Sequence, residues 1–239
     1  MSHDTCGQED AMKSMTTIVN AIPELVSLEG KRVLDAGSGV GGLVRALTKL
    51  GAECFGIEPN SLNVDISKQN DPERQDHYQV AGAENLPFEE GEFDLVVFSN
   101  SLHHVPVDLQ QAAMAESARV VKPGGQVIVA EPVPEGAHFN LSLPMEDETD
   151  VRNHALAAIL DSASHGMTIE VETSFIRPTP YASFEAYHKA MIQVDPARAQ
   201  AFVDRGDQLR ENFVKYARNE GDFSVFDQEI RIHLLNKPG

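Results

Sequence analysis

Basic residues are scarce in this sequence of 239 residues: 19 lysines and arginines stand against 37 aspartates and glutamates, giving a formal net charge of −18. Binding to a phosphate backbone requires clustered positive charge. The composition therefore argues against a nucleic-acid partner. The sequence also lacks an apolar run of about 18 residues, the length that crosses a bilayer, so we expect no membrane partner.

Cysteine is also rare. Cys6 and Cys54 provide neither a disulfide framework nor the spacing of metal ligands, so no metal is expected. Cys54 lies in an apolar stretch, where a buried thiol acts as a small hydrophobe. The N-terminus is polar and acidic and has no secretory signal pattern, so we expect a cytoplasmic location. The sequence leaves the oligomeric state open.

Apolar residues make up 41% of the sequence, which suits a folded α/β domain. Short apolar runs predict strands at 33–34, 53–57, 77–81, 93–98 and 126–130. Amphipathic stretches between them predict helices at 43–50, 62–68 and 109–121, the last with a capping box of Asp108 and Gln111. This alternation favours a doubly wound, Rossmann-like sheet with helices on both faces.

The pattern changes after residue 134. Helices are expected at 151–166 and 183–218, the second broken at Asp195-Pro196, and strands at 167–171 and 230–234. An N-terminal helix is expected from apolar spacing between Met15 and Leu25. We therefore divide the chain into a helical segment (1–29), a core (30–135) and a C-terminal part of the same sheet (136–239). The helical insertion at about 183–218 is expected to shape a substrate pocket.

The most informative segment extends from Val33 to Gly42, where an apolar run ends in Asp35 and a glycine-rich turn follows. Such a turn leads from a buried strand into a helix N-terminus, and glycine allows close approach of a ligand. A carboxylate at the strand tip favours a cationic ligand group over a pyrophosphate. S-adenosylmethionine carries an ammonium and a sulfonium group, so this segment predicts it as the cofactor.

Glycine spacing alone does not identify the cofactor. Gly37, Gly39 and Gly42 also fit the dinucleotide pattern G-x-G-x-x-G, so an NAD-dependent oxidoreductase remains an alternative. Glu58 ends the second predicted strand, where an acid accepts both ribose hydroxyls of either cofactor. The alternative role for Glu58 is that of an acid at the start of the following helix.

The turn is the first of five motifs at ordered intervals; the others are AENLPF (83–88), FDLVV (93–97), LHHV (102–105) and VKPGG (121–125). Together they resemble the class I S-adenosylmethionine-dependent methyltransferases, in the branch of ubiquinone- and menaquinone-biosynthesis-like enzymes, over about residues 30–135. The resemblance implies a seven-stranded, mostly parallel sheet with an antiparallel last strand. It also implies methyl transfer from S-adenosylmethionine, with S-adenosylhomocysteine as the product.

The resemblance further implies which residues bind the cofactor: Asp35, Gly37, Ser38, Gly39, Glu58, Pro59, Ala83, Glu84 and Ser99. The family pattern places the methionine part at Asp35 and the Gly37–Gly39 turn, and the ribose at Glu58. It places the adenine beside Ala83 and Glu84, and the methionine amino group near Ser99. Relatives often carry Asp at the position of Gly82, so the adenine contact is expected from Ala83 or Glu84.

Methyl transfer from a sulfonium is an in-line displacement that depends on positioning and needs no nucleophilic side chain. A general base is needed only for a protonated acceptor, and His103 and His104 are the candidates, with a structural role equally open. Glu131 follows a predicted strand and either faces the functional edge or caps a turn. The acidic charge and the helical insertion favour a small-molecule acceptor. A non-catalytic cofactor-binding module, suggested by Gly82, and methylation of a protein partner remain alternatives.

Overall fold

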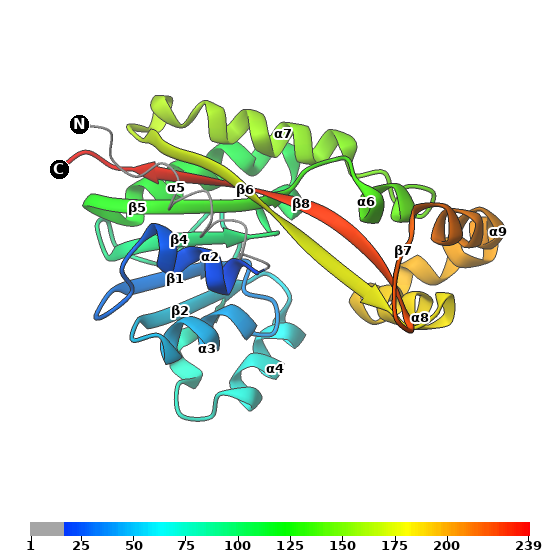
Figure 1. The fold of residues 1–239 in the computed structure, drawn as a ribbon. Helices are drawn as coiled ribbons and strands as arrows, with labels where there is room; N and C mark the ends of the chain where they lie inside the picture. Colours follow the sequence, from blue (N-terminus) through cyan, green and yellow to red (C-terminus); the bar gives the residue numbers. More distant parts are fainter. Residues whose placement is uncertain (1–16) are drawn as a thin grey trace.

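The computed structural model describes residues 17–239, in which one mixed sheet continues into a long two-stranded arm (Figure 1). The strand order is β3-β2-β1-β4-β5-β8-β6, and β7 pairs with β8 to make eight strands. Their bounds are β1 (Arg32–Ala36), β2 (Glu53–Glu58), β3 (Tyr78–Val80), β4 (Phe93–Ser99), β5 (Val121–Pro132), β6 (Thr168–Tyr181), β7 (Arg218–Glu220) and β8 (Phe223–Asn236). The predicted fold class is confirmed: β1 to β5 are parallel, and β8 is antiparallel to both of its long neighbours.

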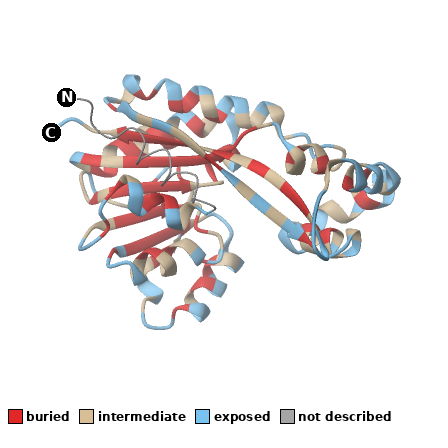
Figure 2. Cartoon of the chain, viewed as in Figure 1, coloured by how far each residue is buried: buried red, intermediate tan, exposed pale blue. Residues whose placement is uncertain are grey.

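Helices cover both faces of the sheet, which explains why the central strands are apolar throughout. The helices are α2 (Ile18–Leu25), α3 (Gly42–Lys49), α4 (Ser61–Asn70), α5 (Gln110–Val120), α6 (Ala137–Ser142), α7 (Thr149–Leu160), α8 (Phe184–Val194) and α9 (Ala199–Tyr216). Buried residues of α5 and α7 pack on one face, and those of α2, α3 and α4 pack on the other (Figures 1 and 2). None of the helices within residues 17–239 is both long and apolar enough to cross a membrane.

The starts of α5 and α2 differ in how far they match the sequence-based expectations. The predicted capping box is wrong: Asp108 lies in a 3₁₀ turn (Val107–Leu109), and α5 starts at Gln110 without a side-chain cap. The backbone N–H of Gln110 instead bonds to the carbonyl of Val107, so the turn itself supplies the acceptor. The N-terminal helix is confirmed from Ile18 onward, whereas Met15 lies outside the described residues.

The arm is formed by β6 and β8, which pair from Thr168 to Tyr181 and extend beyond the end of β5 (Figure 1). The helices α6, α8 and α9 lie at its far end. They share a separate apolar core made of Leu141, Tyr181, Tyr187, Met191, Phe202, Leu209, Phe213 and Phe226. The predicted helix break is confirmed, because Asp195 accepts a hydrogen bond from the N–H of Ala197 at 2.9 Å.

The strand order reverses between β1 and β4, and here the turns that follow the two strands touch. A Cβ atom at Gly37 would lie 2.5 Å from Cβ of Ser101, and Gly37 has a φ of +86°. The Ser101 hydroxyl donates to the carbonyl of Ala36 at 2.6 Å. In parallel α/β sheets, ligands bind in the crevice at such a reversal. The fold therefore directs attention to this edge.

We predict that Gly37→Ala lowers the free energy of unfolding by more than Gly39→Ala does. Both residues have positive φ, which costs an alanine about 1–2 kcal/mol, but a Cβ at Gly39 meets no atom within 4 Å. The overlap with Ser101 adds about 1–3 kcal/mol for Gly37→Ala alone. Urea unfolding of both variants measures the difference, and equal losses would show that the two turns can separate freely.

Candidate active site

A cavity of about 650 Å³ lies at this edge, between the turns that follow β1, β2 and β4. Of the residues predicted from the sequence, those that line it are Gly37, Gly39, Glu58, Pro59, Ala83, Glu84 and His104. Asp35 and Ser38 are buried outside the lining, and Ser99 is the last residue of β4. Most of the predicted cofactor residues are thus brought together around one cavity.

The backbone of the glycine-rich turn is occupied by hydrogen bonds within the protein. The N–H groups of Gly37 and Ser38 donate to the carbonyl of Ile57 at 2.9 and 2.8 Å. The N–H of Gly39 donates to Oε2 of Glu58 at 3.1 Å. Phosphate sites at such turns rely on free N–H groups. These three N–H groups are therefore not available to a pyrophosphate.

Glu58 lines the cavity and also holds the position that the sequence offered as its alternative role, at the start of the following helix. Its carboxylate lines the cavity, and Oε1 also accepts hydrogen bonds from the N–H of Asn60 at 3.1 Å and from Nδ2 of Asn63 at 3.4 Å. These contacts fix the carboxylate at the entry of α4. Its orientation is therefore set before any ligand arrives.

Asp35 is a buried carboxyl group whose negative charge lacks compensation. Its side chain is 2% exposed, and Oδ1 has no hydrogen-bond partner among residues 17–239. Burial, and secondarily the charge of Glu58, raise the pKa of Asp35 to about 7. A positive group in the cavity would stabilise the ionised form.

The Glu84 carboxylate occupies the space beside Gly82. A Cβ atom at Gly82 would lie 2.2 Å from Oε1 of Glu84. Both residues line the cavity. An acidic group therefore stands where a longer side chain at position 82 would lie.

A second cavity of about 390 Å³ lies between this site and the arm. The residues that line both cavities are Asn100, His104, Glu146, Val194 and Arg198. His103 lines only the second cavity. The 3₁₀ turn Leu102–His104 thus stands at the junction of the two cavities.

Glu131, at the end of β5, holds this histidine turn in place. Its Oε1 accepts hydrogen bonds from the N–H groups of Ser101 at 3.1 Å and Leu102 at 2.8 Å. Its Oε2 contacts Nδ1 of His103. A carboxylate can only accept, so His103 donates from Nδ1 and keeps Nε2 available as an acceptor. Burial, and then His103, lower the pKa of His104.

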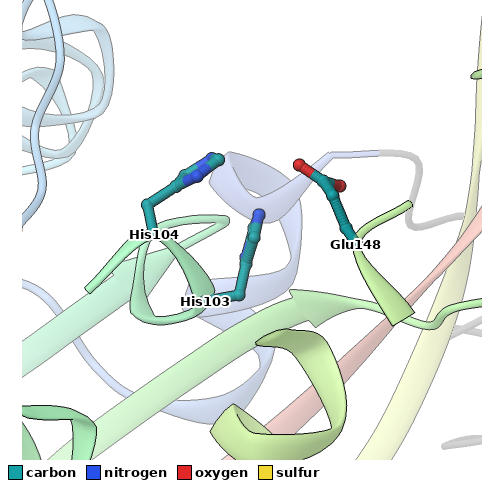
Figure 3. A group of neighbouring side chains, drawn as sticks. All are labelled: His103, His104 and Glu148. Atoms are coloured by element: carbon teal, nitrogen blue, oxygen red, sulfur yellow. The ribbon is translucent and has the colours of Figure 1, made fainter. Parts of the chain in front are cut away.

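His103 and His104 point from one turn toward Glu148, which precedes α7 (Figure 3). Their candidate ligand atoms lie within 4.8 Å of one another, so this group could hold a divalent metal. The contact of His103 with Glu131 resembles the outer support that metal-bound histidines receive. Glu148, however, already pairs with Arg152. The sequence did not indicate this group because Glu148 lies far from the histidines along the chain.

Comparison with known proteins agrees with the geometry. Residues 34–129 match the family model described as a methyltransferase domain. The chain is 37% identical over 117 residues to the chloroplastic tocopherol O-methyltransferase of Arabidopsis thaliana, a match covering 47% of this chain and 32% of that protein. It is 33% identical over 108 residues to the ubiquinone biosynthesis O-methyltransferase of Coxiella burnetii, a match covering 44% of this chain and 45% of that protein. The chain thus spans less than half the length of these two relatives.

Solved structures share the fold across nearly the whole chain. The YcgJ protein of Bacillus subtilis matches with a TM-score of 0.65 and 19% identity, covering 92% of this chain and 98% of that one. The geranyl diphosphate C-methyltransferase of Streptomyces coelicolor matches with a TM-score of 0.53 and 15% identity. The match covers 92% of this chain and 78% of that one. At these identities the likeness concerns the fold alone.

Asp35→Asn should stabilise the protein without ligand, increasingly as the pH rises. The pKa of Asp35 is about 7 in the folded protein against an ordinary value of 3.8, so the folded state holds the proton more tightly. Asp35 therefore costs stability progressively as the pH rises from about 4 through about 7. The gain for the variant at pH 8 should reach about 2–4 kcal/mol. Unfolding curves at pH 5 and pH 8 measure it. The exposed Asp65→Asn is the control, and a pH-independent difference for Asp35→Asn would contradict the assignment.

Proposed function

We propose that this chain, in which residues 34–129 form a class I S-adenosylmethionine-dependent methyltransferase domain, transfers a methyl group from S-adenosylmethionine to a small-molecule acceptor. The observation that carries the proposal is the pair of joined cavities. The first is bounded by the glycine-rich turn and Glu58, and the second opens from it at the histidine turn. One cavity would hold the methyl donor and the other the acceptor.

In this proposal the methionine part of the cofactor lies at the Gly37–Gly39 turn, where its ammonium group offsets the charge of Asp35. The ribose hydroxyls donate to Glu58. The adenine lies beside Ala83, and its amino group donates to Glu84. The orphaned oxygen of Asp35 and the internally bonded turn both support a cationic ligand over a pyrophosphate.

The chain's own residues would contribute positioning and proton removal. In-line attack on the methyl group requires the acceptor atom to be held opposite the sulfur, which contributes about 7–11 kcal/mol in well-oriented reactions. The two curated relatives are named O-methyltransferases, which supports a hydroxyl acceptor. For such an acceptor, His103 is the proposed base through Nε2, because Glu131 fixes its tautomer.

Thermal unfolding with S-adenosylmethionine, S-adenosylhomocysteine and NAD tests the cofactor. A ligand at 100 times its dissociation constant should stabilise the fold by about 2.7 kcal/mol. For a domain of this size, the expected rise in Tm is about 5–10 °C. We expect it with both adenosyl ligands and not with NAD. A rise with NAD alone would establish the oxidoreductase alternative, and tight cofactor binding without turnover of any acceptor would favour a non-catalytic module.

Glu131→Gln should reverse the tautomer of His103 while preserving the turn. The amide oxygen can still accept from Ser101 and Leu102, but the amide nitrogen donates to Nδ1 of His103 and moves the ring proton to Nε2. We expect a loss of about 10²–10⁴-fold in kcat with unchanged affinity for S-adenosylhomocysteine. Nitrogen-15 spectra of the imidazole report the tautomer directly. Glu170→Gln is the control, and an Nδ1–H signal that persists in Glu131→Gln would contradict the proposed role.

A further inference from the structure

The second cavity contains an arginine whose charge has no partner. Arg177 lies on β6 and lines this cavity, and it has no hydrogen bond or ion pair to any residue in 17–239. The other two arginines in the lining are paired: Arg198 with Glu146 at 2.7 Å, and Arg152 with Glu148. The lining therefore has one uncompensated positive charge.

His138, which lines the same cavity, adds no positive charge to it. His138 bonds to the Tyr181 hydroxyl at 3.0 Å, and burial together with Arg177 and Arg152 lowers its pKa to about 4, so it is neutral. Arg177 is half-buried, and burial lowers its pKa as well. An unpaired, partly desolvated guanidinium is costly. The chain has 37 acidic residues, yet none within residues 17–239 pairs with Arg177. The Arg177 guanidinium is therefore available to an anionic ligand.

We propose that the acceptor carries a carboxylate group that binds Arg177. This inference rests on the proposed function, since it identifies the chemical class of the acceptor. The planar guanidinium matches a carboxylate through two parallel hydrogen bonds. Arg177 is thus a specificity-determining residue of the acceptor cavity.

The composition of the cavity favours a singly charged group over a phosphate. The other charged residues of the lining form the pairs Glu146–Arg198 and Glu148–Arg152, so Arg177 leaves one net positive charge, which a carboxylate matches and a doubly charged phosphate exceeds. Arg177 lines only the second cavity, whereas His104 lines both. A carboxylate at Arg177 would therefore leave the opposite end of a small acceptor free to lie at the histidine turn, beside the methyl donor.

The test compares benzoate with benzamide, its uncharged isostere, and with phenyl phosphate. Binding to the full chain is measured by calorimetry, with and without S-adenosylhomocysteine. The variants are Arg177→Met and the control Arg205→Met, which removes the same charge from an exposed position on α9. We expect benzoate to bind the unaltered protein about ten-fold or more tightly than benzamide, and more tightly than phenyl phosphate. Arg177→Met should abolish the preference, and Arg205→Met should retain it.

Equal affinity for benzoate and benzamide in the unaltered protein, or a preference that survives Arg177→Met, would overturn the proposal. Tighter binding of phenyl phosphate would overturn the choice of a carboxylate. Affinity for S-adenosylhomocysteine is measured separately and should be the same in all three proteins. If S-adenosylhomocysteine does not bind the unaltered protein, the proposed function is refuted. If it binds but benzoate is not preferred over benzamide, only the role of Arg177 is refuted. Retained affinity in Arg177→Met also shows that this variant folds.

Discussion

The carboxylate of Glu131 connects the two halves of the site. It accepts from two consecutive backbone N–H groups, those of Ser101 and Leu102, and contacts the ring of His103. Ser101 in turn bonds to the carbonyl of Ala36, at the start of the glycine-rich turn. One buried acid at the end of β5 therefore sets the position of the turn after β4 relative to the turn after β1. Both cavities depend on that position.

The sequence predicted the core of the fold well because its signals there are local. Apolar runs such as 93–98 are typical of strands covered on both faces, and the Asp195-Pro196 break carries its own capping chemistry. The length of the arm was not predicted, since alternation at 167–171 and 230–234 covers only part of β6 and β8. The remaining pairs of the arm form between residues far apart in the chain, and no short pattern encodes that register.

The lining of the first cavity could be predicted to a greater extent than that of the second, for a physical reason. The first cavity is lined largely by turns that directly follow strands, so each turn carries a recognisable motif next to a recognisable strand. Arg152, Arg177 and Glu148 come instead from α7, β6 and the residue before α7. Tertiary packing of α7 and β6 brings them to the cavity that His103 lines. The match to the methyltransferase family ends at residue 129, before any of these three.

Asp35 and Arg177 pose the same physical problem at opposite ends of the site. Among the residues that the structure describes, Asp35 is a buried acid with one oxygen that accepts no hydrogen bond, and Arg177 is a half-buried base without a partner. The two acids that share the cavity of Arg177, Glu148 and Glu146, already pair with Arg152 and Arg198. A ligand with a cationic end would relieve Asp35, and one with an anionic end would relieve Arg177. Within residues 17–239, folding thus leaves two charges of opposite sign for ligands to satisfy: Asp35 is buried next to Ala36, which lines the first cavity, and Arg177 lines the second.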